Sequence, residues 1–175
     1  MGGWAEQMYI RPDTFVYKVP SGLSPRVAVL AELMACTASL DKLKEFSSYA
    51  IEGFNSGDTV VVIGSGPLGL LHIVKADMMG AGRIIATDLS EHRLSFAKRC
   101  GANATLNVSQ SSAEERIHQV MEMTRGRGAD VVLHMANTPA SFIEGIEMLK
   151  RGGMMLEMGN FADTGDINMN IHRHI

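Results

Sequence analysis

Short apolar runs alternate with amphipathic stretches from residue 58 onward. The runs are rich in β-branched residues, and turn-forming residues separate them, which predicts strands at 59–63, 83–87, 104–108, 130–135 and 154–158. Apolar residues fill these runs without alternating with polar ones, which is typical of a parallel sheet covered on both faces. The regular succession of strand and helix predicts a doubly wound α/β fold.

Helix signals fall between the predicted strands. The spacing of apolar residues predicts helices at 68–79, 90–99, 112–124 and 138–151. Ser90 is expected to cap the second of these helices, and Ser112 with Glu115 has the pattern of a capping box at the start of the third. Glycines follow the helices at Gly80, Gly101 and Gly152, as expected where helices end.

The first 57 residues follow a different pattern. Residues 4–19 hold β-forming side chains interrupted by a proline and are expected to be extended. Ser24 followed by proline resembles a helix N-cap, which predicts a helix over 25–40. The stretch 46–57 is expected to be irregular because of its turn residues. We therefore divide the chain into a segment 1–57 and a domain 58–175.

Composition narrows the range of partners. The chain has 175 residues, of which 46% are hydrophobic and 20% charged, and its net charge is −3. With no basic stripe, nucleic acid is not an expected partner, and no apolar run is long enough for a membrane helix. Two cysteines, Cys36 and Cys100, and no secretory signal are typical of a cytoplasmic protein without a disulfide framework.

The strand at 59–63 leads directly into a glycine-rich turn. Gly64 permits a tight turn off the strand, Gly66 lets a pyrophosphate approach the backbone, and Gly69 lets the next helix pack closely. The phosphates would lie over free amides at the start of that helix, where the helix dipole favours negative charge. The pattern predicts a dinucleotide site made by Gly64, Ser65, Gly66, Pro67, Leu68 and Gly69.

A carboxylate follows at the spacing that such a site requires. Asp88 ends the second predicted strand, 19 residues after Gly69. It could accept hydrogen bonds from the adenosine ribose and repel a 2′-phosphate, which favours NAD over NADP. The alternative is that Asp88 caps the next helix, although Ser90 is available for that role. Arg93 either lies beside the adenine ribose or is a solvated helix charge.

Several separate segments are similar to one protein family. They are 57–69, 99–102, 126–132 and 150–161, and each resembles a segment of the cofactor domain of zinc-type medium-chain dehydrogenases/reductases. That family includes alcohol, sorbitol and threonine dehydrogenases. The resemblance implies a Rossmann fold, and hydride transfer between NAD and an alcohol bound to a catalytic zinc. It also implies that the tips of the last two strands contact NAD, through Ala136, Met158, Gly159 and Asn160.

The resemblance further implies what this sequence lacks. The family's first zinc ligands come from an N-terminal catalytic domain, and we expect neither that domain nor the sixth strand of the sheet in this chain. Segment 1–57 would be the part that returns from the catalytic domain and the connecting helix. Glu32 aligns with a glutamate that approaches zinc in polyol dehydrogenases, and the alternative is a carboxylate on a helix surface.

One departure from the family lies after the fourth strand. The usual family motif is replaced by His134-Met135-Ala136-Asn137. A histidine at a strand tip is more often structural than an acid or base, and no pattern of a nucleophilic serine is visible, so we predict no catalytic residue.

We interpret the chain as the NAD-binding domain of a zinc-dependent alcohol or polyol dehydrogenase, which would meet its alcohol through the missing domain. A homo-oligomer is compatible with this interpretation. A stand-alone nucleotide-binding module without catalysis is the alternative. An S-adenosylmethionine-dependent methyltransferase is less favoured, although it also places a glycine loop and an acidic residue around an adenosine group.

Overall fold

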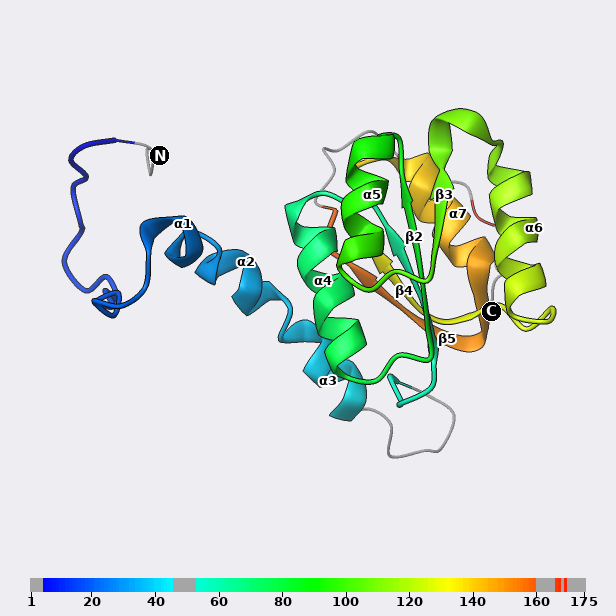
Figure 1. The fold of residues 1–175 in the computed structure, drawn as a ribbon, viewed down its shortest axis with the longest axis horizontal. Helices are drawn as coiled ribbons and strands as arrows, with labels where there is room; N and C mark the ends of the chain where they lie inside the picture. Colours follow the sequence, from blue (N-terminus) through cyan, green and yellow to red (C-terminus); the bar gives the residue numbers. More distant parts are fainter. Residues whose placement is uncertain (1–4, 46–52, 160–165, 168, 170–175) are drawn as a thin grey trace. The chain divides into compact units, whose positions relative to one another are not determined.

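The apolar runs form a five-stranded parallel sheet in a computed structural model, which describes residues 5–45, 53–159, 166–167 and 169. The strand order is β3-β2-β1-β4-β5, and every neighbouring pair is parallel (Figure 1). This order, with β1 at the centre, is that of a doubly wound sheet and confirms the fold class that the sequence predicts. The strands are β1 Thr59–Ile63, β2 Arg83–Asp88, β3 Ala104–Asn107, β4 Ala129–His134 and β5 Leu149–Glu157.

Helices cover both faces of the sheet. Successive residues of β1 point to opposite faces, so that Val60 and Val62 join one apolar core while Val61 and Ile63 join the other. The first core includes residues from α3, α4 and α5, and the second includes residues from α6 and α7. The helices are α3 Ser39–Glu45, α4 Pro67–Met78, α5 Glu91–Arg99, α6 Ala113–Met123 and α7 Pro139–Met148, with a short 3-10 turn η2 at Val108–Gln110.

Burial follows the order of the strands. All residues of β1 and β4 are buried, and so are those of β2 after Arg83. The two edge strands are less covered, and β5 in particular is partly exposed along its length. The continuous apolar runs therefore correctly predict a sheet covered on both faces, but full burial holds only for its centre.

The last helix and strand differ from the prediction. The helix expected to reach Arg151 ends at Met148, and β5 begins at Leu149 rather than at Met154. The reason is pairing with β4: Ala129 pairs with Leu149 and Val131 pairs with Met154 across a bulge. Lys150 Nζ also binds Asp130 Oδ1 at 2.6 Å. Tertiary pairing thus overrides the helical preference of this stretch.

The helix expected over 25–40 is divided into short pieces. They are α1 Pro25–Ala28, α2 Ala31–Cys36 and the start of α3. Between α2 and α3, Thr37 Oγ1 donates to Met34 O at 2.7 Å and Ser39 Oγ donates to Cys36 O at 2.6 Å. Hydroxyls that bind carbonyls of the preceding turn compete with the helix ladder, which accounts for the interruption.

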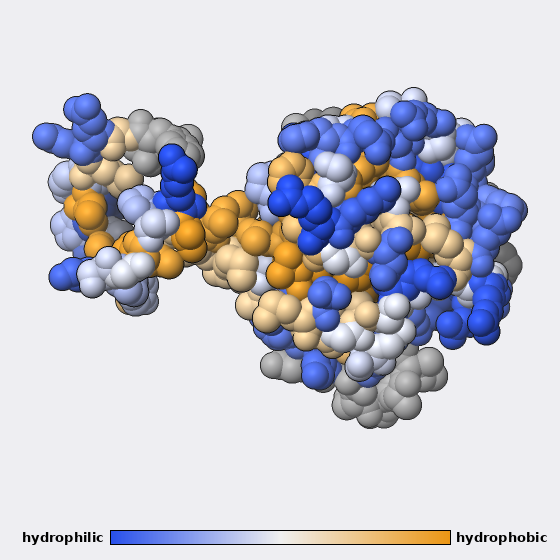
Figure 2. Space-filling view, viewed as in Figure 1, coloured by the Kyte–Doolittle hydropathy of each residue, from blue (hydrophilic) through white to orange (hydrophobic). Residues whose placement is uncertain are grey.

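The chain divides into two units, Met1–Ala31 and Glu32–Ile175, and α3 belongs with the sheet. The boundary between 57 and 58 that the sequence suggests stays a prediction. Residues 5–19, which the sequence predicts to be extended, form no strand of a sheet. Hydrophobic side chains lie at the surface of this unit, with Tyr9, Phe15 and Tyr17 more than four-fifths exposed (Figure 2). Within the described ranges, no helix is long and apolar enough to span a membrane.

Candidate functional site

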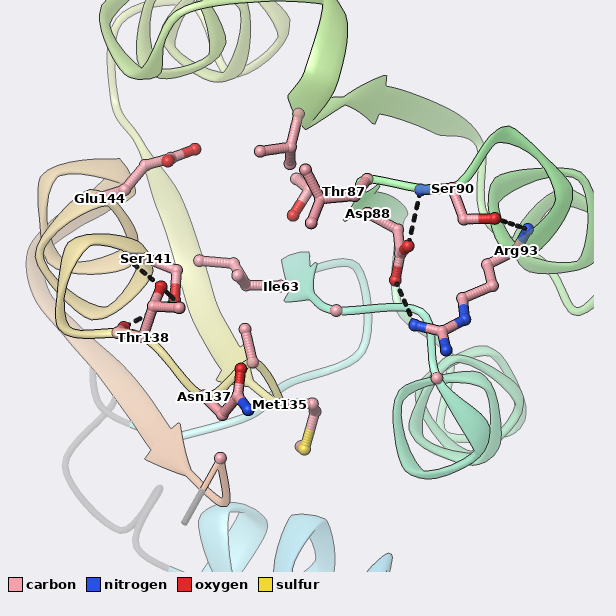
Figure 3. A pocket seen from close by; sticks show the side chains of 16 residues that line it. Ile63, Thr87, Asp88, Ser90, Arg93, Met135, Asn137, Thr138, Ser141 and Glu144 are labelled. Atoms are coloured by element: carbon pink, nitrogen blue, oxygen red, sulfur yellow. Dashed lines mark hydrogen bonds and ion pairs between the residues drawn. The ribbon is translucent and has the colours of Figure 1, made fainter. Parts of the chain in front are cut away.

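A cleft of about 700 Å³ lies at the carboxyl ends of β1, β2 and β4 (Figure 3). Its residues include Gly64 and Gly66 after β1, Asp88 at the end of β2, and Ala136 after β4. From β1 the chain continues to its neighbour β2, and from β4 it continues to β5 in the opposite direction across the sheet. The order of the strands therefore reverses between β1 and β4. Open α/β sheets bind ligands at such a reversal of strand order.

The glycine turn after β1 requires its glycines for different reasons. Gly64 has a φ of +96°, and a Cβ there would lie 3.1 Å from Met135 C and O. A Cβ on Gly69 would lie 1.9 Å from Gly64 O, so α4 can approach the turn only without a side chain at this position. A Cβ on Gly66 would have no atom within 4 Å, and Gly66 lines the cleft. The backbone at Gly66 is therefore open to a ligand.

The turn leads into the positive end of α4. Gly66 is the N-cap of this 12-residue helix and Pro67 its first residue. The first amides of a helix have no carbonyl partner within it, so those of Leu68 and Gly69 can meet an anion above the turn. These features fit a pyrophosphate group.

Asp88 is tightly held. Its Oδ2 accepts a hydrogen bond from Ser65 N at 2.9 Å and its Oδ1 accepts one from Ser90 N at 2.8 Å. The pairing of Ile63 with Thr87 brings the glycine turn beside the end of β2, which places Ser65 N next to this carboxylate. Each carboxylate oxygen has a second lone pair, however, so Asp88 can still accept from a ligand hydroxyl.

Two neighbours define the surroundings of Asp88. Ser65 is fully buried, and its amide orients Asp88 from behind the cleft. Arg93 Nη1 lies 3.7 Å from Asp88 Oδ2, and the Arg93 side chain is 56% exposed beside the cleft. Ser90 Oγ accepts from Arg93 N at 3.4 Å, which confirms Ser90 as the N-cap of α5. The alternative in which Asp88 takes that position is thereby excluded.

The opposite wall contains a buried histidine. His134 at the end of β4 is completely buried, and its Nε2 lies 2.8 Å from Ser141 Oγ. Its Nδ1 contacts Glu157 Oε2, and its ring lies edge-on to Phe142 at 5.7 Å between centroids. Glu157 Oε1 in turn accepts from Gly159 N at 2.5 Å. His134 therefore links the ends of β4 and β5 to the start of α7.

A buried ion pair supports the same wall. Arg116 of α6 and Glu144 of α7 form two hydrogen bonds of 2.7 Å each, from Nε to Oε1 and from Nη2 to Oε2. The hydrogen bond to Glu144 raises the pKa of Arg116, so the guanidinium remains charged. Glu144 lines the cleft, and Arg116 Nη1 also donates to Val108 O at 3.3 Å in η2.

The structure divides the predicted site residues into two groups. Those that line the cleft are Gly64, Gly66, Asp88, Arg93, Ala136 and Gly159. Those that do not line it are Ser65, Pro67, Leu68, Gly69 and Met158, and Asn160 lies outside the described residues. Sequence reasoning missed further lining residues, among them Thr87, Leu89, Val108, Asn137, Thr138 and Ser141. A search of every position next to a strand's carboxyl end would have found most of them.

A metal site is not assembled by the described residues. In these ranges, no group of three or more His, Cys, Asp or Glu side chains is placed to hold a metal ion. Glu32 lies exposed on α2, where its Oε1 accepts from Cys36 Sγ at 3.7 Å. Desolvation and, second, the charge of Glu32 raise the pKa of the Cys36 thiol, which keeps it protonated. The described residues thus do not by themselves fit a zinc ion.

Comparison with known proteins identifies the family. Residues 67–174 match the family model described as zinc-binding dehydrogenase. The chain belongs to the zinc-binding dehydrogenase family. Two curated relatives agree with this membership. D-xylulose reductase A of Aspergillus niger is 32% identical over 158 residues, which cover 90% of this chain and 42% of that protein. The erythritol/L-threitol dehydrogenase of Mycolicibacterium smegmatis is 30% identical over 172 residues, or 97% of this chain and 44% of that protein.

Solved structures agree with the family assignment. The alcohol dehydrogenase of Thermotoga maritima is 35% identical, with a TM-score of 0.71, and the match covers 87% of this chain and 41% of that one. The benzyl alcohol dehydrogenase of Acinetobacter calcoaceticus, at 23% identity and a TM-score of 0.71, shares the fold. The chain spans less than half the length of the relatives it matches. The family resemblance and the Rossmann-like fold expected from the sequence are confirmed.

Proposed function

We propose that the cleft binds NAD(H) and that this chain is the coenzyme-binding part of a dehydrogenase acting on an alcohol or polyol. One observation carries the proposal. A bare backbone at Gly66 opens the start of α4 to an anion, and a held carboxylate, Asp88, lies on the same cleft. Family membership favours a dinucleotide over S-adenosylmethionine, and two relatives are named for xylulose and for erythritol or L-threitol.

Each part of NAD has a suitable counterpart in this proposal. The pyrophosphate would lie against Gly64, Gly66 and the first amides of α4. The adenosine ribose hydroxyls would donate to Asp88, with Arg93 beside them. The nicotinamide half would extend toward Ala136 and Gly159, and by resemblance toward Met158 and Asn160. When bound, NAD supplies the hydride acceptor, and the protein's own residues bind and orient it.

Zinc and alcohol enter the proposal only through the family. The described residues do not fit a zinc ion, so we assign no step to one, and Glu32 remains a proposed ligand within a longer enzyme. We therefore expect the 175-residue chain by itself to bind NAD with little or no turnover. The alternative is a module that binds nucleotide without catalysis. It is compatible with the finding that no group of metal-ligating side chains comes together among the described residues. A cytoplasmic location and a homo-oligomer also remain predictions.

Isothermal titration calorimetry with NAD, NADH and NADP tests the proposal. We expect binding of NAD and NADH, and about tenfold weaker binding of NADP, equivalent to about 1.4 kcal/mol, because Asp88 repels a 2′-phosphate. No heat with any of them at millimolar concentration would contradict the dinucleotide site. Equal affinity for NADP would contradict the role of Asp88 alone. NADH fluorescence with polyols as substrates then separates a catalytic chain from a binding module.

A further inference from the structure

A serine, a histidine and a carboxylate lie in series on one wall of the cleft. Ser141 Oγ is 2.8 Å from His134 Nε2, and His134 Nδ1 contacts Glu157 Oε2. The histidine is completely buried, whereas Ser141 lines the cleft. Figure 3 shows Ser141 on the opposite side of the cleft from Asp88, near Thr138. The serine hydroxyl is thus reachable from the cleft, and the histidine that it contacts is buried.

The order of these groups matches that of an activated nucleophile. A carboxylate on Nδ1 keeps the proton on that nitrogen, so that Nε2 is unprotonated and can accept the proton of a hydroxyl. The sheet itself maintains this arrangement, because His134 and Glu157 are register partners on β4 and β5. Glu157 is held further by the amide of Gly159, at 2.5 Å from Oε1.

The position of Ser141 also favours developing negative charge. It is the third residue of α7, close to the positive end of that helix. The amide of Ala140 in the same turn has no carbonyl partner within the helix, and the side chain of Asn137 lines the same cleft. Backbone amides and asparagine side chains are the usual donors to an oxyanion. Thr138 O, at 2.8 Å, competes with His134 for the serine proton.

We propose that Ser141 is an activated nucleophile that cleaves small activated esters, with His134 as its general base and Glu157 as the residue that positions His134. Ser141 Oγ forms a bond to the ester carbonyl carbon as its proton moves to His134 Nε2. The alkoxide or phenolate leaves and takes that proton. Water then attacks the acyl-serine, again giving its proton to Nε2, and the serine is regained as the acid departs. The proposal goes beyond coenzyme binding and does not depend on it.

The chain offers a matched control in Ser95. Ser95 Oγ donates to His92 O at 2.7 Å, just as Ser141 Oγ lies 2.8 Å from Thr138 O, and in both cases the carbonyl belongs to the third residue before the serine. Both serines lie on helices. Ser141 differs in its contact with a histidine ring nitrogen. A difference in reactivity between the two therefore reports on His134 rather than on a helical serine in general.

Labelling with a fluorophosphonate probe, mapped by peptide mass spectrometry, tests the proposal on the whole chain. We expect Ser141 to react at least about 100-fold faster than Ser95, the range that general-base assistance provides. We expect the Ser141→Ala variant to lose hydrolysis of p-nitrophenyl acetate and the Ser95→Ala variant to keep it. Reaction of Ser141 no faster than that of Ser95 in the folded protein overturns the proposal.

The roles of His134 and Glu157 need variants that keep the fold. Glu157→Gln removes the charge and keeps one side-chain oxygen, which can accept from His134 or from Gly159 N but not from both. We expect slower labelling of Ser141 in a protein that still folds, and Glu157→Asp should restore part of the rate. His134→Gln is the second variant, and it should abolish the selective labelling. Unchanged labelling in a folded Glu157→Gln protein overturns the arrangement, and this result remains available if His134→Gln fails to fold.

Discussion

Arg116 and Glu144 form a two-pronged ion pair inside the protein, with side chains that are only 6% and 8% exposed. The pair joins α6 to α7, and through the bond from Arg116 to Val108 O it also holds η2, whose first residue lines the cleft. Breaking a buried pair leaves one charge without a partner, which is far more costly than removing both charges together.

We therefore expect Arg116→Met to lower the free energy of unfolding by about 3–5 kcal/mol. The double variant Arg116→Met with Glu144→Leu should recover most of that loss, because no lone charge remains. It should still bind NAD more weakly than the wild type, since η2 loses its bond from Arg116. Urea unfolding and calorimetry of both proteins measure these effects. A double variant as unstable as the single one would contradict the explanation by an unpaired charge.

A substitution at Gly66 should weaken NAD binding without changing the stability of the fold. Its φ of −70° suits alanine, and a Cβ there meets no atom within 4 Å. Gly66→Ala should therefore change the stability by less than about 0.5 kcal/mol. It should weaken NAD binding at least about tenfold, because the methyl group occupies the approach to the backbone. Gly22→Ala, at another open glycine, is the control. Full NAD affinity in Gly66→Ala would contradict the proposed phosphate position.

Asp88 has a structural role as well as the proposed one toward ribose. In Asp88→Asn an NH₂ group replaces one acceptor, so the amide of Ser65 or Ser90 loses its partner. We expect a loss of about 1–3 kcal/mol in the free energy of unfolding and a smaller preference for NAD over NADP. Asp41→Asn, which breaks the exposed pair with Lys75, should cost less than about 1 kcal/mol. Equal losses in the two variants would contradict the importance of the Asp88 hydrogen bonds.

Burial of His72 should make the stability of the protein depend on pH. It is completely buried in α4, its Nδ1 lies 2.9 Å from Leu68 O, and its Nε2 has no hydrogen-bond partner among the described residues. Burial lowers its pKa from the ordinary value, so the folded protein favours the neutral ring. As the pH falls below about 6.5, the unfolded chain takes up a proton that the folded one does not, and stability decreases.

The His72→Leu variant isolates this contribution. Its free energy of unfolding should fall less steeply than that of the wild type as the pH is lowered from about 7.5 to about 5.5, by at most about 1.4 kcal/mol per pH unit. Near neutral pH it should be about as stable as the wild type, because it loses a polar atom without a partner along with one local hydrogen bond. Urea unfolding at several pH values gives the comparison. Parallel slopes for the two proteins would show that His72 is not the source.

Much of the fold could be predicted from local signals. Ser112 and Glu115 form the expected capping box, and Ser90 caps its helix, because these bonds involve only neighbouring residues. The start of β5 could not be predicted, since Leu149 and Lys150 suit a helix and become a strand only by pairing with β4. The division of the helix near Thr37 has a local cause, because the hydroxyl of Thr37 binds Met34 O, but apolar spacing alone does not reveal it.

The amino-acid sequence by itself determined the kind of sheet, the succession of strands and helices, and the glycine turn. Continuous apolar runs require burial on both faces of the sheet, and glycine alone has the backbone freedom that the turn needs. Only the tertiary structure decided which groups meet at the cleft. Asp88 accepts a hydrogen bond from Ser65 N, and His134 contacts Glu157, because of the register of parallel strands that are far apart in the chain. Hydrogen-bond partners across strands depend on that register, and no local pattern along one strand specifies it.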